Sequence, residues 1–446
     1  MIPISICYLR AIASAALLWV VAWAALEAHG ETNATAVTGS PYVLSLPIAR
    51  ERVLQNHPGI TVAELRAVAA RAATTVARSA YFPTVSLNGT AVGTGDANTR
   101  IAAGGLNNPL IYDRAAVGLS FTQVLTDFGR TSHLTASARE DEKSSREQVL
   151  ATRAQLLLEV DGAYFQVLRG LALRRVAIQR SDARKLVLEY ISNLASNQLR
   201  SQLDVSFARV AVEESRLLLD QAETEIQSAQ TTLASLTGIK SPESIQVEEV
   251  TTALDMAEEV GGMVVVALAH RPEVALAQAE QRSARERQKA ETALDYPTLN
   301  AFGSGGASLI HDDHLESRFA AAGVNISLPL FNGGYTSGRQ RQAKALADAA
   351  EAKVRDVEES VMREVRLSWL AAHHACEQIR LTEALVQNAD ASLALAKARY
   401  EQGLSSFLDL NQAELTETSA QVARANAQYE YLMQRDRLEF ETGNLK

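Results

Sequence analysis

Two long stretches of the sequence contain no proline and keep apolar residues at every seventh position. One lies between Pro109 and Pro242, and the other begins after Pro329. The heptad rows are Leu150, Leu157, Tyr164, Leu171 and Ile178; Val205, Val212, Leu219, Ile226 and Leu233; Val365, Ala372, Ile379, Val386 and Leu393; and Leu408, Leu415 and Val422. Proline-free heptads of this length predict long helices that fold back as antiparallel coiled-coil hairpins.

The expected helices differ in length. A helix at 129–193 would span roughly 95 Å at about 1.5 Å per residue, whereas its return helix, 204–237, would cover only about half of that. A helix at 59–80 can supply the missing half if it stacks end to end on the return helix. The composition agrees, because 47% hydrophobic but only 5% aromatic residues suit Ala-rich helices better than several globular cores.

The two stretches belong to an internal duplication. Two proline motifs, at 56–58 and 82–84, recur 214 residues later, and the motif Ser201 to Asp204 recurs 205 residues later as Ser406 to Asp409. Each copy, of about 180 residues, is too long for a solenoid repeat. The expected organisation is a signal segment at 1–30, a first structural repeat at 31–238, a linker at 239–262, a second repeat at 263–443 and a short C-terminal end at 444–446.

Short segments with the alternation of a strand precede each long helix. Val85 and Leu87 alternate with Ser86 and Asn88, and similar segments occur at 117–122, 299–305 and 324–330. Taken alone, the strands fit a half-buried hairpin of a soluble domain better than a membrane strand, although about ten residues is the length of a tilted membrane strand. The long helices beside them favour membrane strands. Four strands cannot close a barrel, so several chains would share one.

The first residues have the pattern of an export signal. Arg10 precedes an apolar run at 11–26, and Ala28-His29-Gly30 offers a cleavage site. Cys7 lies ahead of the run, so no lipid anchor is expected, and Cys376 alone remains, which excludes an intrachain disulfide. Past the signal no window approaches the roughly 20 apolar residues of a spanning helix. The net charge of −9 argues against a nucleic-acid partner.

The motifs, taken in this order, resemble the TolC family of outer-membrane efflux and export channels over essentially the whole mature sequence. The resemblance rests on the paired proline motifs, on Val124 to Gly129 and Leu328 to Gly334 at the strand-to-helix joins, and on Tyr400 to Leu404 ahead of Asp409. The join residues that carry it are Gly129, Pro329, Gly333 and Gly334.

The resemblance implies a mainly helical α+β protein that assembles as a homotrimer. Four strands from each chain would form one 12-stranded transmembrane β-barrel in the outer membrane, continued by an α-barrel of coiled-coil hairpins across the periplasm. The protein would be the passive exit duct of a tripartite efflux pump or a type I secretion system. Its partners would be a periplasmic adaptor protein, an inner-membrane transporter of the RND or ABC type, and outer-membrane lipid. No cofactor, metal or enzymatic activity is implied.

In the family, a tyrosine, an arginine and two aspartates constrain a gate at the helical turns. Tyr400 and Asp409 match the tyrosine and the first aspartate. Ser405 stands in place of the arginine, and Gln412 in place of the second aspartate. The resemblance therefore implies a periplasmic gate with fewer charges, in which Asp204 is the counterpart of Asp409 in the first copy.

A second interpretation of the two aspartates is purely structural. Asp204 and Asp409 each follow a serine by three residues, which is the spacing of a helix capping box. The two roles are compatible. The resemblance also implies adaptor-contact tips, at Gly403 and Leu404 in the second copy and at Leu199, without a glycine, in the first.

The main rival interpretation is a soluble periplasmic coiled-coil scaffold or adaptor, whose strands would form a small sheet without an apolar outer band. Metal binding is not expected at His311 to His314, because polar residues are usual in a loop between strands. Gly303 to Gly306 lack the strand-turn-helix context of a phosphate loop. No pairing of a nucleophile with a base calls for an enzyme. The loops at 94–108 and 309–317 should lie at the outer surface.

Overall fold

The computed structural model describes residues 42–92, 114–250, 259–310 and 316–445. The expected signal segment, the loop at 94–108 and the segment His311 to His314 lie outside the described residues. The chain divides into two units, Met1–Tyr42 and Val43–Lys446, and almost all described elements belong to the second.

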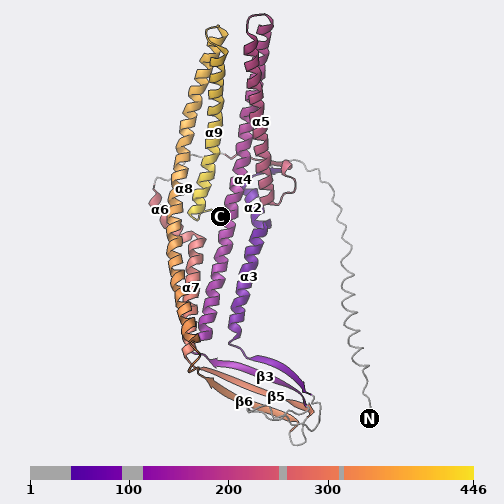
Figure 1. The fold of residues 1–446 in the computed structure, drawn as a ribbon, viewed down its shortest axis with the longest axis vertical. Coiled ribbons are helices and arrows are strands. Elements are labelled where there is room, and N and C mark those ends of the chain that lie inside the picture. The colour runs from indigo at the N-terminus through magenta and orange to yellow at the C-terminus, as the bar shows by residue number, and fades with distance from the viewer. Residues whose placement is uncertain (1–41, 93–113, 251–258, 311–315, 446) are drawn as a thin grey trace, which may run out of the picture. The chain divides into compact units, whose positions relative to one another are not determined.

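Long helices and one four-stranded sheet make up the second unit (Figure 1). The helices are α2 (Leu46–Asn56), α3 (Pro58–Ser79), α4 (Arg130–Ser196), α5 (Gln202–Thr237), α6 (Val260–His270), α7 (Pro272–Thr292), α8 (Tyr335–Glu401) and α9 (Phe407–Glu441), with short 3₁₀ turns η1 (Pro242–Ser244) and η2 (Ala293–Asp295). The strands are β1 (Tyr42–Leu44), β2 (Thr84–Val92), β3 (Arg114–Thr126), β4 (Ile245–Val247), β5 (Thr298–Ile310) and β6 (Arg318–Ser327).

The helical hairpins confirm the coiled-coil prediction. The helix α4 packs along α5, and α8 packs along α9. As expected, α3 covers the part of α4 that α5 does not reach, and α7 does the same for α8. Figure 1 shows each short helix below the return helix of its hairpin. The two copies meet along α4, which contacts α7 near the sheet and α9 nearer the tips.

The predicted heptad rows face the interior in α5 and α8 but only in part in α4, where Leu150 and Ile178 are 47% and 42% exposed, and the row in α9 is wrong. Leu408 and Leu415 are 65% and 40% exposed in the single chain. The buried face of α9 starts instead at Phe407, whose ring meets that of Tyr400 edge to face at 6.2 Å, and continues at Leu410. This aromatic contact at the tip sets the rotation of α9, and a heptad counted from Leu408 is displaced by one residue.

The proline motifs mark breaks between consecutive helices. His57 separates α2 from α3, and its ring Nδ1 accepts a hydrogen bond from the backbone of Gly59 at 3.1 Å. Arg271 separates α6 from α7 in the same way, with Pro272 at the first helical position. Neither α2 nor α6 was expected, because a proline motif read alone indicates where a helix begins and not what precedes it.

The region expected to be a linker contains further structure. It holds η1, β4 and the first residues of α6, and β4 pairs with β1 as a two-stranded ribbon. The hydroxyl of Tyr164 on α4 lies 3.1 Å from the carbonyl oxygen of Leu44 and 2.7 Å from that of Glu248. This buried tyrosine therefore ties the ribbon to the middle of α4.

The four-stranded sheet has the order β2-β3-β5-β6, and every neighbouring pair is antiparallel. In the register, Leu87 pairs with Leu119, Leu119 with Gly305 and Gly305 with Ala320. One face is therefore largely apolar: Val85, Leu87, Gly89, Ala91, Ala115, Val117, Leu119, Phe121, Ala301, Gly303, Gly305, Ala307, Ala320, Ala322, Val324 and Ile326, with Gln123 and Arg318 as polar members. The other face carries the polar residues Ser86, Asn88, Thr90, Ser120, Thr122, Asn300, Ser304, Asn325 and Ser327, together with Phe302 and Phe319.

The apolar face of this sheet is exposed. Among the described residues, the four strands make their extensive contacts only with one another, and no helix lies across either face. Leu87, for example, is 71% exposed. A water-soluble domain would bury such a face, because exposed apolar patches of this extent are costly. The sheet therefore argues against the half-buried hairpin and for contact with lipid.

The glycines of β5 make room for aromatic rings from neighbouring strands. A methyl group on Gly303 would lie 2.2 Å from the ring of Phe121, and one on Gly306 would lie 2.3 Å from the backbone oxygen of Val117. The ring of Phe319 covers Gly118 and Gly306. The glycine-rich run at 303–306 is thus a strand whose gaps are filled by aromatic side chains.

Within the described residues, no single helix has the length and apolar character of a membrane span. The helix α6 and the segment 272–295 reach that length and apolar character only when taken as a pair, and the pair is bent by 46° at its junction.

Candidate functional site

The two copies share their unusual backbone positions. Among the described residues, those with a left-handed backbone form four pairs that are each 205 positions apart. The pairs are Phe128 and Gly333, Gly129 and Gly334, Gln198 and Gly403, and Gly238 and Gly443. Since φ above zero is unfavourable for residues other than glycine, these matching positions indicate that both copies use the same turns.

The strand-to-helix joins are two of these turns. Gly129 has φ +97° and Gly334 has φ +88°, and each directly precedes a long helix. The carboxylate of Asp127 accepts a 2.7 Å hydrogen bond from the backbone N–H of Thr131 and so caps the start of α4. Asn332 occupies the equivalent place before α8, where its side chain bonds to Thr336 at 2.5 Å. Pro329, Gly333 and Gly334 therefore lie at the predicted join.

The hairpin tips have the same backbone despite their different sequences. Gln198 adopts φ +60°, where Gly403 has φ +74° in the second copy. The lack of a glycine at the first tip is thus accommodated by strain at Gln198 and not by a different turn. Leu199 and Leu404 follow these residues, and both side chains are exposed.

Capping boxes start both return helices, as the serine-to-aspartate spacing predicts. Ser406 and Asp409 bond reciprocally, at 2.9 Å from the Ser406 backbone N–H to the carboxylate and 3.2 Å from the Asp409 N–H to the hydroxyl. Ser201 and Asp204 repeat this arrangement with bonds of 3.3 Å in both directions. Hydrogen bonds from Ser406 hold the pKa of Asp409 below its usual value.

Tyr400 lies at the centre of the tip region. Its side chain is 3% exposed and belongs to an apolar cluster that joins both hairpins: Ile191, Val205, Ala208, Tyr400, Phe407 and Leu410. Burial raises the pKa of Tyr400, and the nearby guanidinium of Arg200 opposes that rise. Within the described part of the chain, the hydroxyls of Tyr400 and Ser405 are buried and have no hydrogen-bond partner.

Arg200 is a tip residue that the sequence interpretation missed. Its guanidinium lies 4.5 Å from the centre of the Tyr400 ring, a cation–π contact between the first hairpin and the second. Arg200 lies 205 positions before Ser405, the residue that the resemblance puts in place of the gate arginine. The duplication offset could therefore have identified it. The tip retains an arginine, supplied by the other copy, while Gln412 is exposed on α9.

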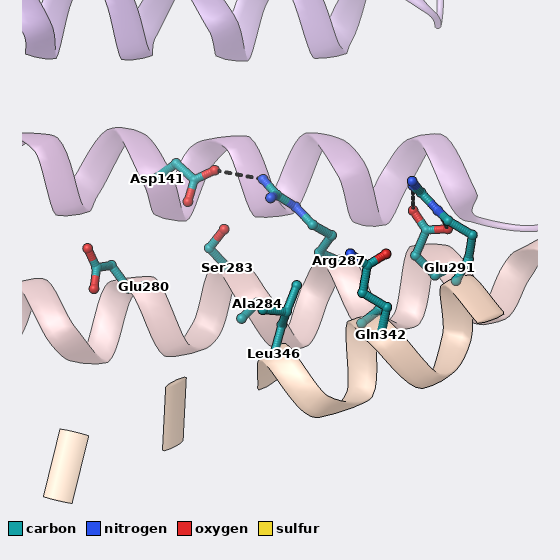
Figure 2. A pocket seen from close by; sticks show the side chains of 10 residues that line it. Asp141, Glu280, Ser283, Ala284, Arg287, Glu291, Gln342 and Leu346 are labelled. Carbon is teal, nitrogen blue, oxygen red and sulfur yellow. Dashed lines mark hydrogen bonds and ion pairs between the residues drawn. The ribbon is translucent and has the colours of Figure 1, made fainter. Parts of the chain in front are cut away.

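A groove at the opposite end of the helices is a seam of paired charges. It has a volume of about 330 Å³ and lies where α4, α7 and α8 meet (Figure 2). Asp141 pairs with Arg287 at 3.3 Å across the groove, and Glu291 pairs with Arg339 at 2.6 Å. Hydrogen bonding to Arg339 lowers the pKa of Glu291. The charged side chains of the groove thus join α4 to α7 and α7 to α8.

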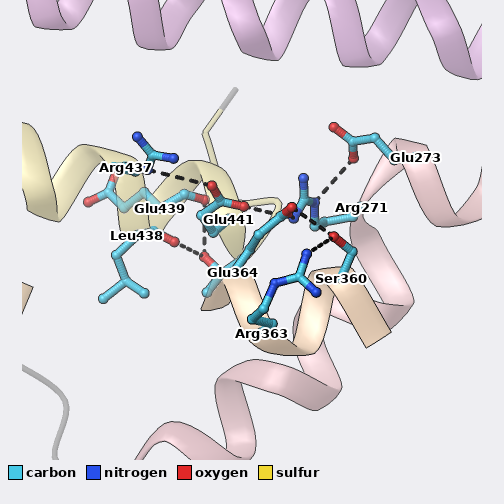
Figure 3. Close-up of polar contacts among 10 residues, drawn as sticks. Arg271, Glu273, Ser360, Arg363, Glu364, Arg437, Leu438, Glu439 and Glu441 are labelled. Atoms are coloured by element: carbon cyan, nitrogen blue, oxygen red, sulfur yellow. Dashed lines mark hydrogen bonds and ion pairs between the residues drawn. The ribbon is translucent and has the colours of Figure 1, made fainter. Parts of the chain in front are cut away.

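Another charged cluster surrounds the break between α6 and α7 (Figure 3). The buried guanidinium of Arg271 lies 2.7 Å from the carboxylates of both Glu364 and Glu441 and 3.2 Å from that of Glu273. These residues come from α7, α8 and the end of α9. Burial raises the pKa of Glu441, although Arg271 opposes it. One arginine therefore holds together three helices of the second copy.

Residues 49–239 and 263–444 match the model of a protein family described as "Outer membrane efflux protein". The two matched segments cover most of the chain, and the chain belongs to this family. It is accordingly an outer-membrane efflux protein, as the resemblance implied. The family consists of transport proteins and not of enzymes, and the soluble-scaffold interpretation is set aside.

Curated relatives and solved structures agree with this assignment. The chain is 27% identical over 379 residues to the probable efflux pump outer membrane protein TtgC of Pseudomonas putida, covering 83% of this chain and 77% of that protein. It is 26% identical to outer membrane protein TolC of Salmonella enteritidis, covering 77% and 71%. In fold it is similar to the outer membrane protein VceC of Vibrio cholerae, with a TM-score of 0.79, 22% identity and coverage of 89% and 96%. The predicted TolC-like fold, mainly helical with few strands, is confirmed.

Proposed function

We propose that three copies of the chain join their sheets into one 12-stranded transmembrane barrel and act as the passive exit duct of an efflux pump. The observation that carries the proposal is a four-stranded sheet that, within the described ranges of the chain, has two unpaired edges and an uncovered apolar face. Because adjacent strands alternate in direction, β6 of one copy would run antiparallel to β2 of the next. A ring of identical sheets can therefore close without a mismatched pair, and closure removes the edges that lipid does not tolerate.

The proposed partners are a periplasmic adaptor and an inner-membrane transporter of the RND or ABC type, with outer-membrane lipid around the barrel. The relative TtgC is named as the outer membrane protein of an efflux pump, which supports the existence of such partners. The exposed tip residues Leu199, Gly403 and Leu404 are the proposed adaptor contacts. No nucleic acid or cofactor takes part in the proposed mechanism.

The duplication supports the proposed division into repeats at 31–238 and 263–443, with a linker at 239–262, a signal segment at 1–30 and a C-terminal end at 444–446. Each pair of left-handed turn residues that lie 205 positions apart has one member in the first proposed repeat and one in the second.

The proposed assembly requires the mature protein to fractionate with outer membranes and to need detergent for extraction. Native mass spectrometry of the extracted protein should give three chains per particle. A monomer purified from the soluble periplasmic fraction would overturn the proposal.

We further propose that the tips form the periplasmic gate of the duct. Tyr400, held beneath Arg200, would pin the second hairpin to the first, and Ser405 and Gln412 would lie beside it without charge. Asp204 and Asp409 would face the passage as rings of three carboxylates, which attract cations. The capping hydrogen bonds of Asp204 and Asp409 use one carboxylate oxygen, Oδ2, so the other oxygen can face the passage while the residue still caps its helix.

Replacing Asp409 with alanine separates the gate role from the capping role. If three Asp409 carboxylates line the closed end, Asp409→Ala trimers should lose cation selectivity in planar-bilayer recordings. Asp409→Asn should leave the start of α9 nearly as stable, because an asparagine side chain can still accept the capping hydrogen bond. Unchanged conductance and selectivity in stable Asp409→Ala trimers would remove Asp409 from the gate and leave it only a capping role.

A further inference from the structure

Four charged side chains are buried where the two hairpins meet. Arg180 and Arg184 lie one turn apart on α4, and Glu414 and Glu417 lie one turn apart on α9. Arg184 forms an ion pair with Glu414 and donates a 2.6 Å hydrogen bond to Asn411. Arg180 lies 3.2 Å from Glu417 and 3.9 Å from Glu414. Each arginine therefore reaches from the first hairpin to the second.

The burial of these groups makes their charges costly. The side chain of Arg184 is 3% exposed, and the other three are also buried. Burial lowers the pKa of both arginines and raises the pKa of Glu417. Replacing buried ion pairs by packed apolar side chains is often neutral or stabilising. Stability alone therefore gives little reason for four charges at this place.

Contacts within each hairpin have a different chemistry. Along α4 and α5 the buried residues are mainly apolar, such as Val205, Val212 and Leu233, and α8 meets α9 through Val386, Ala389 and Ala420. An apolar seam loses its hydrophobic stabilisation when it opens, whereas separated charges regain hydration from water. The contact between α4 and α9 is apolar in the tip cluster around Tyr400, but its charged part behind that cluster is suited to holding when water is excluded and to separating when water enters.

The position of the cluster is also informative. Glu414 lies seven residues along α9 from Phe407, or about 10 Å at ~1.5 Å per residue, so the cluster lies just behind the apolar tip layer around Tyr400. At the tip itself, Arg200 of the first hairpin contacts the second through the ring of Tyr400 and not through a carboxylate. Among the described residues, the ion pairs that join α4 to α9 lie behind the tip, at Arg180 and Arg184.

We propose that Arg180, Arg184, Glu414 and Glu417 form an ionic lock that holds the two hairpins together while the passage is closed and separates when it opens. The inference rests on the proposed gated duct. It adds four residues that control passage to the gate residues implied by the tip motifs. It also predicts that water enters between the four charged side chains when the two hairpins separate.

The test neutralises one side of the seam. In the double variant Glu414→Gln/Glu417→Gln, two buried guanidinium groups lose their counter-charges, so the closed state is destabilised. Single-channel recordings in planar bilayers should show an open probability about tenfold higher than that of the unaltered protein, which corresponds to about 1.4 kcal/mol. Amide hydrogen exchange should become faster at the tip-side halves of α4 and α9 and remain unchanged in α3 and α7.

Two further variants make the test specific. Exchanging all four charges, as Arg180→Glu/Arg184→Glu/Glu414→Arg/Glu417→Arg, should restore the low open probability. The control Glu225→Gln removes the half-buried pair between Arg169 and Glu225 within the first hairpin and should leave the open probability unchanged.

Three outcomes would count against the account in distinct ways. Stable Glu414→Gln/Glu417→Gln trimers with the open probability of the unaltered protein would overturn the lock, and so would a charge exchange that stays open. Trimers that insert but never conduct in any variant would overturn the proposed duct. If the trimers never conduct, faster amide hydrogen exchange in Glu414→Gln/Glu417→Gln, confined to the tip-side halves of α4 and α9, would still support the role of the four charges in holding the hairpins together.

Discussion

Replacing Arg271 with alanine should lower the free energy of unfolding by about 3–5 kcal/mol. The change leaves the buried carboxylate of Glu441 and its neighbours Glu364 and Glu273 without the guanidinium that all three contact. The loss can be measured by urea unfolding of the detergent-extracted protein, followed by the fluorescence of Trp369, which lies on α8 five residues from Glu364.

The matched control for this prediction is Arg437→Ala. Arg437 also pairs with Glu441, at 3.7 Å, but its own side chain is 58% exposed. Exposed pairs contribute about 0–1 kcal/mol, so this variant should unfold close to the unaltered protein. Equal effects of the two substitutions would show that the Arg271 cluster does not hold the three helices together.

The effect of Arg271→Ala should depend on pH. Burial already raises the pKa of Glu441, and loss of Arg271 removes the main influence that opposes the rise. A carboxyl group whose pKa is higher in the folded state contributes its stability below the unfolded pKa and loses it as the pH rises through the folded pKa. The stability gap between the variant and the unaltered protein should therefore be widest near neutral pH and shrink on acidification. A gap that widens on acidification would contradict this assignment of the charge.

The second large effect is expected in the sheet, at Gly306. A methyl group there would lie 2.3 Å from the carbonyl oxygen of Val117 and 2.7 Å from the Cα of Gly118, and both are backbone atoms of β3. The neighbouring strand cannot move aside without losing its hydrogen bonds to β5. Gly306→Ala should therefore destabilise each chain by about 3 kcal/mol and sharply reduce the yield of assembled protein in the membrane.

Gly305→Ala provides the matched control, because it adds the same methyl group one residue earlier in the same strand. Its nearest neighbour would be the carbonyl oxygen of Phe319 at 3.5 Å, an ordinary contact. Membrane yield and the urea midpoint should stay near those of the unaltered protein. Similar losses in both variants would mean that β5 tolerates no added side chain, and that the close approach of β3 at Gly306 is not the cause.

The parts of the fold that rest on repetition could be predicted from the sequence. Period-seven rows without proline gave the helical hairpins to within a few residues, and period-two alternation gave the four strands. The internal duplication then predicted which elements are equivalent. Local periodicity was sufficient to place these elements because amphipathic helices repeat their apolar positions at a fixed spacing, although in α4 and α9 the buried face differs in part from the predicted row.

Features that depend on side chains meeting across elements were not predictable in this way. The rotation of α9 is set by Phe407 against Tyr400, which are neighbours only after the hairpin has folded. Arg200 reaches Tyr400 from a turn 200 residues away in the chain. The buried charges around Arg184 look like ordinary solvent-exposed helix residues in the sequence, because a heptad pattern assigns charges to the outer face. Arg271 lies in the break between α6 and α7, where no heptad pattern applies.

The central claim is that sheets from three copies close into one barrel, and disulfide cross-linking between the edge strands tests it most directly. In a Cys376→Ala background, a cysteine replaces Asn88 on β2, and a second replaces Ala321, Gly323 or Asn325 on β6 in turn. All four positions lie on the same face of the sheet. A pair at Asn88 and Gly118, partners within one chain, is the control and should give no cross-linked oligomers.

Oxidation in isolated outer membranes should link one chain to the next through at least one of the three pairs. Denaturing gels should then show species of one, two and three chains and none larger, because the third link closes the ring. Absence of links between chains for every pair, or a ladder that continues beyond three chains, would contradict a closed barrel shared by three copies.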